Sequence, residues 1–419
     1  MRIGFLGTFT EVDGQAIYLE HEIKAWRQVF PDDVIFVASE AGIAPKREIW
    51  PPLIEQSFPP SGRFHLVECW NRHDLKDGDF GSAKHILTAN HLDIVNVMHE
   101  WGLFGFPDGQ GGMYRHTQDS DKRFINFTHN LQASGIPVVI TLFTPSLFGD
   151  ISKYFAELSA AHYIVQGGRS DLDIMIGENK VPPEKVSFVQ EPLAPYDETR
   201  ETILSVRDRL GLPSGCIFLV TGFWRLENRI GKIIEAFKIA YDYAERNKLQ
   251  IPTLVFAGTV HPNDKGPVKE YLRQCMMWAY RKGLAKNVIF TNKFHTEKEV
   301  DDYLYACDVA LSYRETNTHA ISTSGAAFRA MAAKRPLIAF DSSGVSQLPS
   351  NTCIKVRSAE EMGERMIDLM THSSKTDLLL IKLLQAQNLF YQTYSCYSAV
   401  QRYREIFQRV IDTWHPAGS

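Results

Sequence analysis

The sequence has no long apolar segment, and its cysteines are few and scattered. No stretch of the 419 residues approaches the about 20 consecutive apolar residues that a membrane-spanning helix needs. The short apolar run at the N-terminus is followed directly by acidic residues, so we interpret it as a buried strand rather than a signal peptide. The six cysteines show no C-x-x-C or other metal-ligand spacing, which is typical of free thiols in a reducing compartment. These absences predict a soluble, cytoplasmic protein that is at most peripheral to a membrane.

Neither sign of charge is in large excess. Lys and Arg number 45 and Asp and Glu 49, which gives a formal net charge of -4 at pH 7. A chain with this balance has no overall field that would draw it onto nucleic acid or anionic lipid, so a nucleic-acid partner is disfavoured. The length, together with a composition close to that of an ordinary globular protein, predicts two domains or three small ones.

Apolar runs of strand length alternate with longer segments of helical period along the chain. In the first half, helices are predicted at 16–29 and 146–159 and strands at 2–6, 33–38, 94–97, 137–142, 162–165 and 185–189. The pattern then restarts, with helices near 231–246, 268–282, 297–306 and 325–333 and strands at 216–221, 253–257, 288–291, 309–312 and 336–340. Such alternation is typical of α/β architecture, and we predict two doubly wound, Rossmann-like domains.

The connection between the two halves is predicted at 191–196, which contains two prolines and has neither period. This gives an N-terminal domain over 1–192 and a C-terminal domain over 193–390. The helical, aromatic-rich tail over 391–419 is expected to pack back on the N-terminal domain. Two regions fit neither period and are predicted to be surface loops: 43–74 and the glycine-rich 106–114.

A polar turn follows the first strand of the second half. Two doubly wound domains that face each other create a central cleft at the carboxyl ends of their sheets, where helix N-termini favour phosphate. Gly222 permits close approach of the backbone to a ligand, and Arg225 and Arg229 are suited to neutralise a diphosphate. An ordinary solvated loop is the alternative interpretation of the two arginines.

A second polar loop, 312–325, precedes the helix at 325–333. We expect Thr323, Ser324 and Gly325 to cap this helix and to hold phosphate oxygens through backbone N–H groups. Glu315 is placed to accept hydrogen bonds from the hydroxyls of a sugar. Simple capping of a surface helix is the alternative.

Motifs over nearly the whole chain match patterns of one enzyme family. G-F-W-R at 222–225 matches G-F-x-R-x-x-K, I-E-A-F at 234–237 matches the motif that follows it, and N-V-M-H-E-W-G-L-F-G at 96–105 matches N-V-Q-H-E-F-G-I-F-G of one branch. The segment 288–344 is the most similar. The chain thus resembles the nucleotide-sugar glycosyltransferases of the GT-B architecture, specifically retaining family 4, also called group 1. The resemblance implies transfer of a hexose from a UDP- or GDP-sugar to an acceptor hydroxyl, with no obligatory metal or other cofactor.

The resemblance also implies roles for individual residues. His99 would hydrogen-bond the transferred sugar or the backbone near the anomeric carbon, and Glu100 would orient the histidine or an acceptor hydroxyl. Gly14 takes the place of the family's glycine-rich turn under the donor phosphates. A structural histidine and a plain tight turn are the respective alternatives.

The chain departs from the family pattern at two donor positions. Asn228 stands where the family has a lysine that would meet the diphosphate, which leaves Arg229 as a substitute. Arg329 stands at the position of the second glutamate of the E-x7-E motif, which in the family binds the ribose of the donor. The D-x-D triplets are interpreted as loop or helix-surface acids, so no metal site is predicted. The acceptor is open among a saccharide, a lipid-linked sugar and a modified nucleobase. A sugar-nucleotide epimerase and a non-catalytic nucleotide-sugar-binding protein are the alternative functions.

Overall fold

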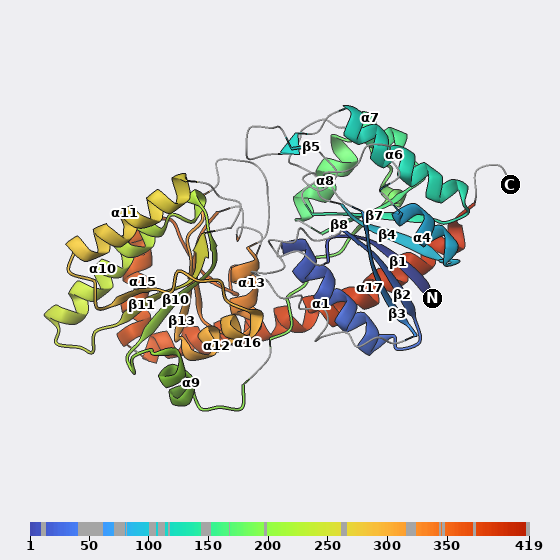
Figure 1. The fold of residues 1–419 in the computed structure, drawn as a ribbon. Helices are drawn as coiled ribbons and strands as arrows, with labels where there is room; N and C mark the ends of the chain where they lie inside the picture. Colours follow the sequence, from blue (N-terminus) through green and yellow to red (C-terminus); the bar gives the residue numbers. More distant parts are fainter. Residues whose placement is uncertain are drawn as a thin grey trace. The chain divides into compact units, whose positions relative to one another are not determined.

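The computed structural model places most of the chain (Figure 1). It describes residues 1–9, 14–40, 62–70, 80, 82–99, 106–107, 114–115, 118–143, 152–166, 168–196, 199–260, 266–315, 324–342, 345, 348–371 and 374–415. The chain divides into two compact units: Met1–Pro192 with Ala320–Ser322 and Tyr394–Ser419, and Leu193–His319 with Thr323–Thr393. Within the described residues, no helix is long and apolar enough to cross a membrane.

The first unit is built on a parallel sheet. Its described strands are arranged in the order β3-β2-β1-β4-β7-β8-β9. Their bounds are Arg2–Gly7 (β1), Val34–Glu40 (β2), Phe64–Trp70 (β3), Ile94–His99 (β4), Val138–Leu142 (β7), His162–Val165 (β8) and Val186–Phe188 (β9). The strand order reverses direction between β1 and β4, which pair in parallel from Ile3 opposite Ile94 to Leu6 opposite Val97.

Helices cover both faces of this sheet because alternate residues of each strand are buried on opposite sides. One cluster packs Val95, Val97 and Ile140 against α4 (Ala83–Ala89), α6 (Gln118–Ala133), α7 (Ser152–Glu157) and α8 (Arg169–Gly177). The other packs Ile94 and Val139 against α1 (Gly14–Val29) and α17 (Cys396–Thr413). The last helix of the chain is therefore part of the first unit.

The second unit repeats this plan. Its described strands are arranged in the order β12-β11-β10-β13-β14-β15, all parallel. Their bounds are Ile217–Trp224 (β10), Thr253–Val260 (β11), Val288–Phe290 (β12), Val309–Ser312 (β13), Leu337–Phe340 (β14) and Ile354–Val356 (β15). On one face lie α10 (Ile230–Arg246), α11 (Pro267–Arg281) and α15 (Ala359–Thr371). On the other lie α9 (Ile203–Leu210), α12 (Glu297–Ala306), α13 (Gly325–Ala332) and α16 (Ser374–Tyr394).

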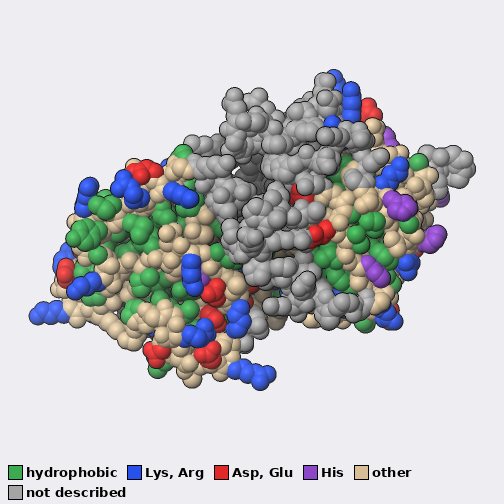
Figure 2. Space-filling model, viewed as in Figure 1, with side chains coloured by type: hydrophobic (Ala, Val, Ile, Leu, Met, Phe, Trp, Pro, Cys, Tyr) green, Lys and Arg blue, Asp and Glu red, His purple; other side chains and the backbone are tan. Residues whose placement is uncertain are grey.

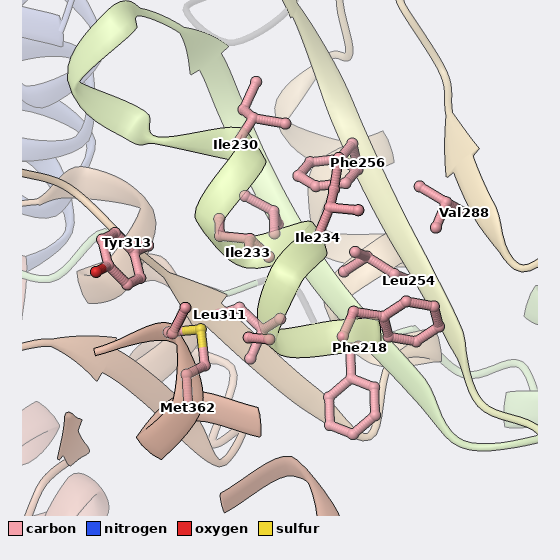
Figure 3. Close-up of a cluster of buried hydrophobic side chains, with 14 of the residues drawn as sticks. Phe218, Ile230, Ile233, Ile234, Leu254, Phe256, Val288, Leu311, Tyr313 and Met362 are labelled. Carbon is pink, nitrogen blue, oxygen red and sulfur yellow. The ribbon is translucent and has the colours of Figure 1, made fainter. Parts of the chain in front are cut away.

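The core of the second unit extends to the carboxyl end of its sheet, as Figure 3 shows. Ile230, Ile233 and Ile234 of α10 are fully buried and lie over β10 and β11. Burial of each such side chain stabilises the fold by about 1.5–3 kcal/mol. Because Ile230 opens α10 and Tyr313 directly follows β13, this core fixes the loops beside them.

One predicted loop is partly wrong. Of the region 43–74, residues 64–70 form strand β3, which pairs with β2, while 43–61 and 71–74 lie outside the described residues. β3 is an edge strand whose middle residues are exposed, so its sequence shows neither a continuous apolar run nor a clean alternation. The region 106–114 also includes paired strand residues, because β5 (Phe106–Pro107) pairs antiparallel with β6 (Tyr114–Arg115).

Candidate functional site

The candidate site lies at the carboxyl end of the second sheet, where the strand order reverses. β10 and β13 are neighbours there, paired in parallel with Phe218 opposite Val309. In doubly wound sheets the loops that follow the two strands at this point diverge to opposite faces and leave room for a ligand. The turn from β10 to α10 and the loop after β13 therefore meet at the position where this fold binds ligands.

The turn after β10 has a fixed conformation that exposes Arg225. Gly222, near the end of β10, has φ of 113°, which favours glycine, and a Cβ there would meet nothing within 4 Å. Asn228 Oδ1 accepts a hydrogen bond from the backbone N–H of Arg225 at 2.8 Å, which closes the short helical turn Leu226–Asn228. Asn228 therefore holds the turn together from within. Arg229, with φ of 45°, precedes the first residue of α10.

The loop after β13 is attached to this turn at two points. The backbone N–H of Glu315 donates to the carbonyl of Glu227 at 2.9 Å. Arg229 Nε donates to Glu315 Oε2, also at 2.9 Å. Tyr313 is buried and stacks on Phe340 with ring centroids 4.3 Å apart, and burial, with Glu315 nearby, raises its pKa to about 12. The structure thus brings the predicted residues Arg225, Arg229 and Glu315 to one edge.

Sequence analysis missed Arg314, which lies between the two anchored residues of this loop. Its side chain is half-buried. Burial lowers its pKa, the nearby charge of Arg225 lowers it further, and Glu227 acts in the opposite direction. The only available signal was its place in a loop already predicted to bind a ligand. Its closeness to Arg225 depends on the pairing of β10 with β13.

The first turn of α13 lies in the same unit. Ser324 Oγ accepts a hydrogen bond from the backbone N–H of Ala327 at 3.4 Å, so Ser324 is the N-cap and Gly325 the first residue of the helix. The predicted cap is therefore present at Ser324. Thr323 lies outside the described residues.

Arg329 contacts acidic residues of α12. Its Nε donates to Asp301 Oδ1 at 2.9 Å, and its Nη1 donates to Glu297 Oε1 at 2.7 Å. Its Nη2 also donates to the carbonyl of Glu297 at 3.1 Å. The guanidinium of Arg329 thus joins α13 to α12, and its predicted contact with the donor stays a prediction.

In the first unit His99 is the last residue of β4, again where the strand order reverses. The residue is 2% exposed, with Nε2 3.0 Å from Tyr154 Oη and the ring centroid 4.8 Å from that of Phe124. This is the environment of a histidine packed among aromatic side chains, and its predicted role at the sugar stays a prediction. Gly14 is the first residue of α1, whereas Glu100 lies outside the described residues.

The first unit also contains a buried pair of carboxyl groups that sequence analysis missed. Glu22 of α1 accepts a hydrogen bond from Gln166 Nε2 at 2.6 Å. Burial raises the pKa of Glu22 to about 8, against the effect of this bond, and the nearby Glu191 adds to the rise. Burial likewise raises the pKa of Glu191 to about 7, against a hydrogen bond from Tyr18. Strongly shifted carboxyl groups are common at functional sites, so this pair is a second candidate in the first unit.

Charge on one face of the described surface is mixed. On the face shown in Figure 2, Lys and Arg side chains are interspersed with Asp and Glu on both units. Among the described residues no group of His, Cys, Asp and Glu is arranged to hold a metal ion. We call the edge that carries Arg225 and Arg314 the cationic edge.

Comparison with known proteins identifies the class of fold. The structure is similar to HepE of Anabaena in complex with UDP, with a TM-score of 0.68 and 15% identity over 98% of this chain and 100% of that chain. It is also similar to a glycosyltransferase of Rickettsia africae, with a TM-score of 0.71 and 12% identity over 99% of each chain. For the sucrose-phosphate synthase of Thermosynechococcus elongatus, the TM-score is 0.66 and the identity 13%, over 99% of this chain and 100% of that chain. The two parallel sheets with alternating helices are thus those of the GT-B glycosyltransferases, as predicted.

A family model matches part of the second unit. Residues 217–372 match the model of the family described as glycosyl transferases group 1, which confirms the resemblance seen in the sequence. A search of curated proteins found no match. The matched segment contains Gly222, Arg225, Arg229, Arg314 and Glu315, so the candidate site lies within it.

Proposed function

We propose that the protein is a glycosyltransferase that moves a hexose from a nucleotide-diphosphate sugar to an acceptor hydroxyl, with retention of configuration. One observation carries this proposal: the cationic edge at Arg225, placed at the strand-order reversal inside the segment that matches the group 1 family. Gly222 leaves open space beside the backbone at the same edge, which suits a ligand that must approach closely.

The proposed chemistry depends on stabilising the leaving group. Negative charge develops on the diphosphate as its bond to the sugar breaks. Arginine side chains and the backbone N–H groups at the start of α13 are the donors suited to that charge. In this proposal they supply the positive charge that a metal ion supplies in other transferases. Glu315 is proposed to contact the sugar and Arg329 to contribute to donor binding.

The N-terminal domain is proposed to bind the acceptor, and the C-terminal domain over 193–390 is proposed to bind the donor. The tail over 391–419 is proposed to complete the acceptor domain. His99 and Glu100 are proposed to act at the transferred sugar, and Gly14 to lie under the donor phosphates. A saccharide, a lipid-linked sugar and a modified nucleobase are the acceptor classes to test. The HepE structures contain UDP and UDP-glucose, which makes UDP-sugars the first donors to test and GDP-sugars the second.

The test is a transfer assay with the purified protein. A panel of UDP- and GDP-sugars is incubated with each acceptor class, and released nucleotide and glycosylated acceptor are separated chromatographically. Arg225→Ala should abolish most turnover. Arg246→Ala, which removes an exposed arginine at the far end of α10, is the matched control and should leave turnover unchanged. Turnover that is identical in both variants and the wild type would place the donor site elsewhere.

One further observation favours a second candidate, a protein that binds a nucleotide sugar without transferring it. Asn228 and Arg329, which replace the family's lysine and glutamate, are both hydrogen-bonded within the protein. The same assay separates the candidates. Binding without release of nucleotide would support the binding protein, and an interconverted sugar nucleotide would support the epimerase.

A further inference from the structure

The cationic edge of the second sheet lacks the second positive charge that the family pattern provides after Arg225. Asn228 occupies the lysine position, and its side chain accepts the Arg225 N–H bond inside the turn. Arg229 is the next cation along the chain, but its Nε lies 2.9 Å from Glu315 Oε2. A carboxylate at that distance largely cancels the charge that Arg229 presents to an anion.

Arg314 is held beside the same turn by the residues on either side of it. Tyr313 is 4% exposed and stacked on Phe340, and the backbone of Glu315 is bonded to Glu227, two residues beyond Arg225. Neither neighbour can move without breaking these contacts. The backbone of Arg314 is therefore fixed next to the turn that carries Arg225, although 88 residues lie between the two arginines in the sequence.

The charges around Arg314 favour an anion. Arg225 lies close enough to disfavour the charged form of Arg314, while Glu227 favours it. Two guanidinium groups that are brought together, one of them half-buried, repel each other, and a dianion placed between them removes that repulsion. A guanidinium also binds phosphate through two parallel hydrogen bonds, which gives the pair a defined geometry.

We propose that Arg314 and Arg225 together hold the diphosphate of the donor, and that Arg314 supplies, from the loop after β13, the positive charge that a lysine at position 228 supplies in the family pattern. This inference rests on the proposed function. It assigns Arg229 a different task, which is to keep the two loops together through its ion pair with Glu315. The contact of Glu315 with the sugar remains as proposed above.

The experiment measures binding of UDP and UMP to the full-length protein by calorimetry. Arg314→Met retains the half-buried aliphatic stem, and Arg314→Gln retains hydrogen-bonding capacity; circular dichroism identifies which of them is folded. Each folded variant should bind UDP about 10- to 100-fold more weakly than the wild type, as loss of a hydrogen bond to a charged group implies. UMP, which lacks the second phosphate, should lose less. Arg246→Gln is the matched control and should bind both nucleotides like the wild type.

A compensating substitution separates a phosphate contact from a merely structural role. Asn228→Lys added to Arg314→Met should recover at least part of the lost UDP affinity, because it restores the second cation from the family's own position. Unchanged UDP affinity in the folded Arg314 variants, or equal losses for UDP and UMP with no recovery by Asn228→Lys, would overturn the inference and leave the proposed function standing. Absence of UDP and GDP binding by the wild type would refute the proposed function itself, and the inference with it.

Discussion

Replacing Glu22 by glutamine should stabilise the first unit at alkaline pH and change it little at acidic pH. Glu22 is 3% exposed, and burial raises its pKa from 4.5 to about 8. Because the folded pKa lies above the unfolded value, the folded protein holds the proton more tightly than the unfolded chain. The contribution of this carboxyl group to stability is thus complete below the unfolded pKa and is lost as the pH rises through the folded pKa.

The magnitude follows from the two pKa values. Because the folded and unfolded pKa values differ, the free energy of unfolding of the wild type should fall by roughly 3 kcal/mol between about pH 5.5 and about pH 8.5. In a domain of this size each kcal/mol corresponds to about 2–4 °C in Tm. Glutamine does not ionise, so Tm of the variant relative to that of the wild type should rise by roughly 6–12 °C over this pH range.

Differential scanning calorimetry of both proteins at the two pH values provides the measurement. Glu405→Gln, the same change at an exposed position of α17 in the same unit, is the control and should shift Tm equally at both pH values. Suppose instead that Glu22→Gln shifts Tm by the same amount at both pH values. Glu22 would then be ionised in the folded protein throughout, and the reasoning from burial would be wrong.

Four further outcomes are expected. Arg225→Ala should weaken donor binding by about 1.5–3 kcal/mol in calorimetry, the scale of a hydrogen bond to a charged group, and Arg229→Ala should cost less because Glu315 already neutralises it. Glu315→Gln should reduce turnover more than affinity for the bare nucleotide, and equal losses would contradict its contact with the sugar. His99→Ala should lower single-turnover transfer by about 10²–10⁴-fold at saturating donor if the histidine acts at the reacting centre, whereas near-normal transfer would leave it a core residue. Burial alone would raise the pKa of Asp33, but the hydrogen bonds that it accepts from Arg404, the N-terminal ammonium and Trp26 lower this pKa overall. Asp33→Asn should therefore lower Tm at neutral pH. The difference in Tm should shrink as the pH falls through the pKa of folded Asp33.

The sequence predicted the central strands because strands buried on both faces read as continuous apolar runs. β1, β4 and β13 are of this kind, and each was predicted to within two residues of its observed bounds. β3 was missed because half of an edge strand faces solvent. The identity of β3 as a strand depends on pairing with β2 more than on its own residues.

The candidate site divides in the same way. Gly222 and Arg225 were found because they follow a predicted strand in a recognisable pattern. Glu22 was missed because it follows Glu20 and His21 in the sequence, a pattern typical of a solvated helix face. Its observed partners, Gln166 and Glu191, are more than 140 residues away. Contacts of that range have no local signal.

The second positive charge at the proposed donor site illustrates the difference between a motif and the chemical requirement behind it. A motif fixes the position of a lysine after Arg225, but a diphosphate requires only that two cations reach it. At the strand-order reversal, the loops after β10 and β13 contact each other, so in our proposal either loop can supply the cation. When position 228 becomes asparagine, a search along the motif turns to Arg229, the nearest arginine in sequence. The fold instead pairs Arg229 with Glu315 and brings Arg314 beside Arg225. Sequence reasoning detects the departure, but finding the arginine that we propose compensates for it requires the pairing of strands that are distant in the chain.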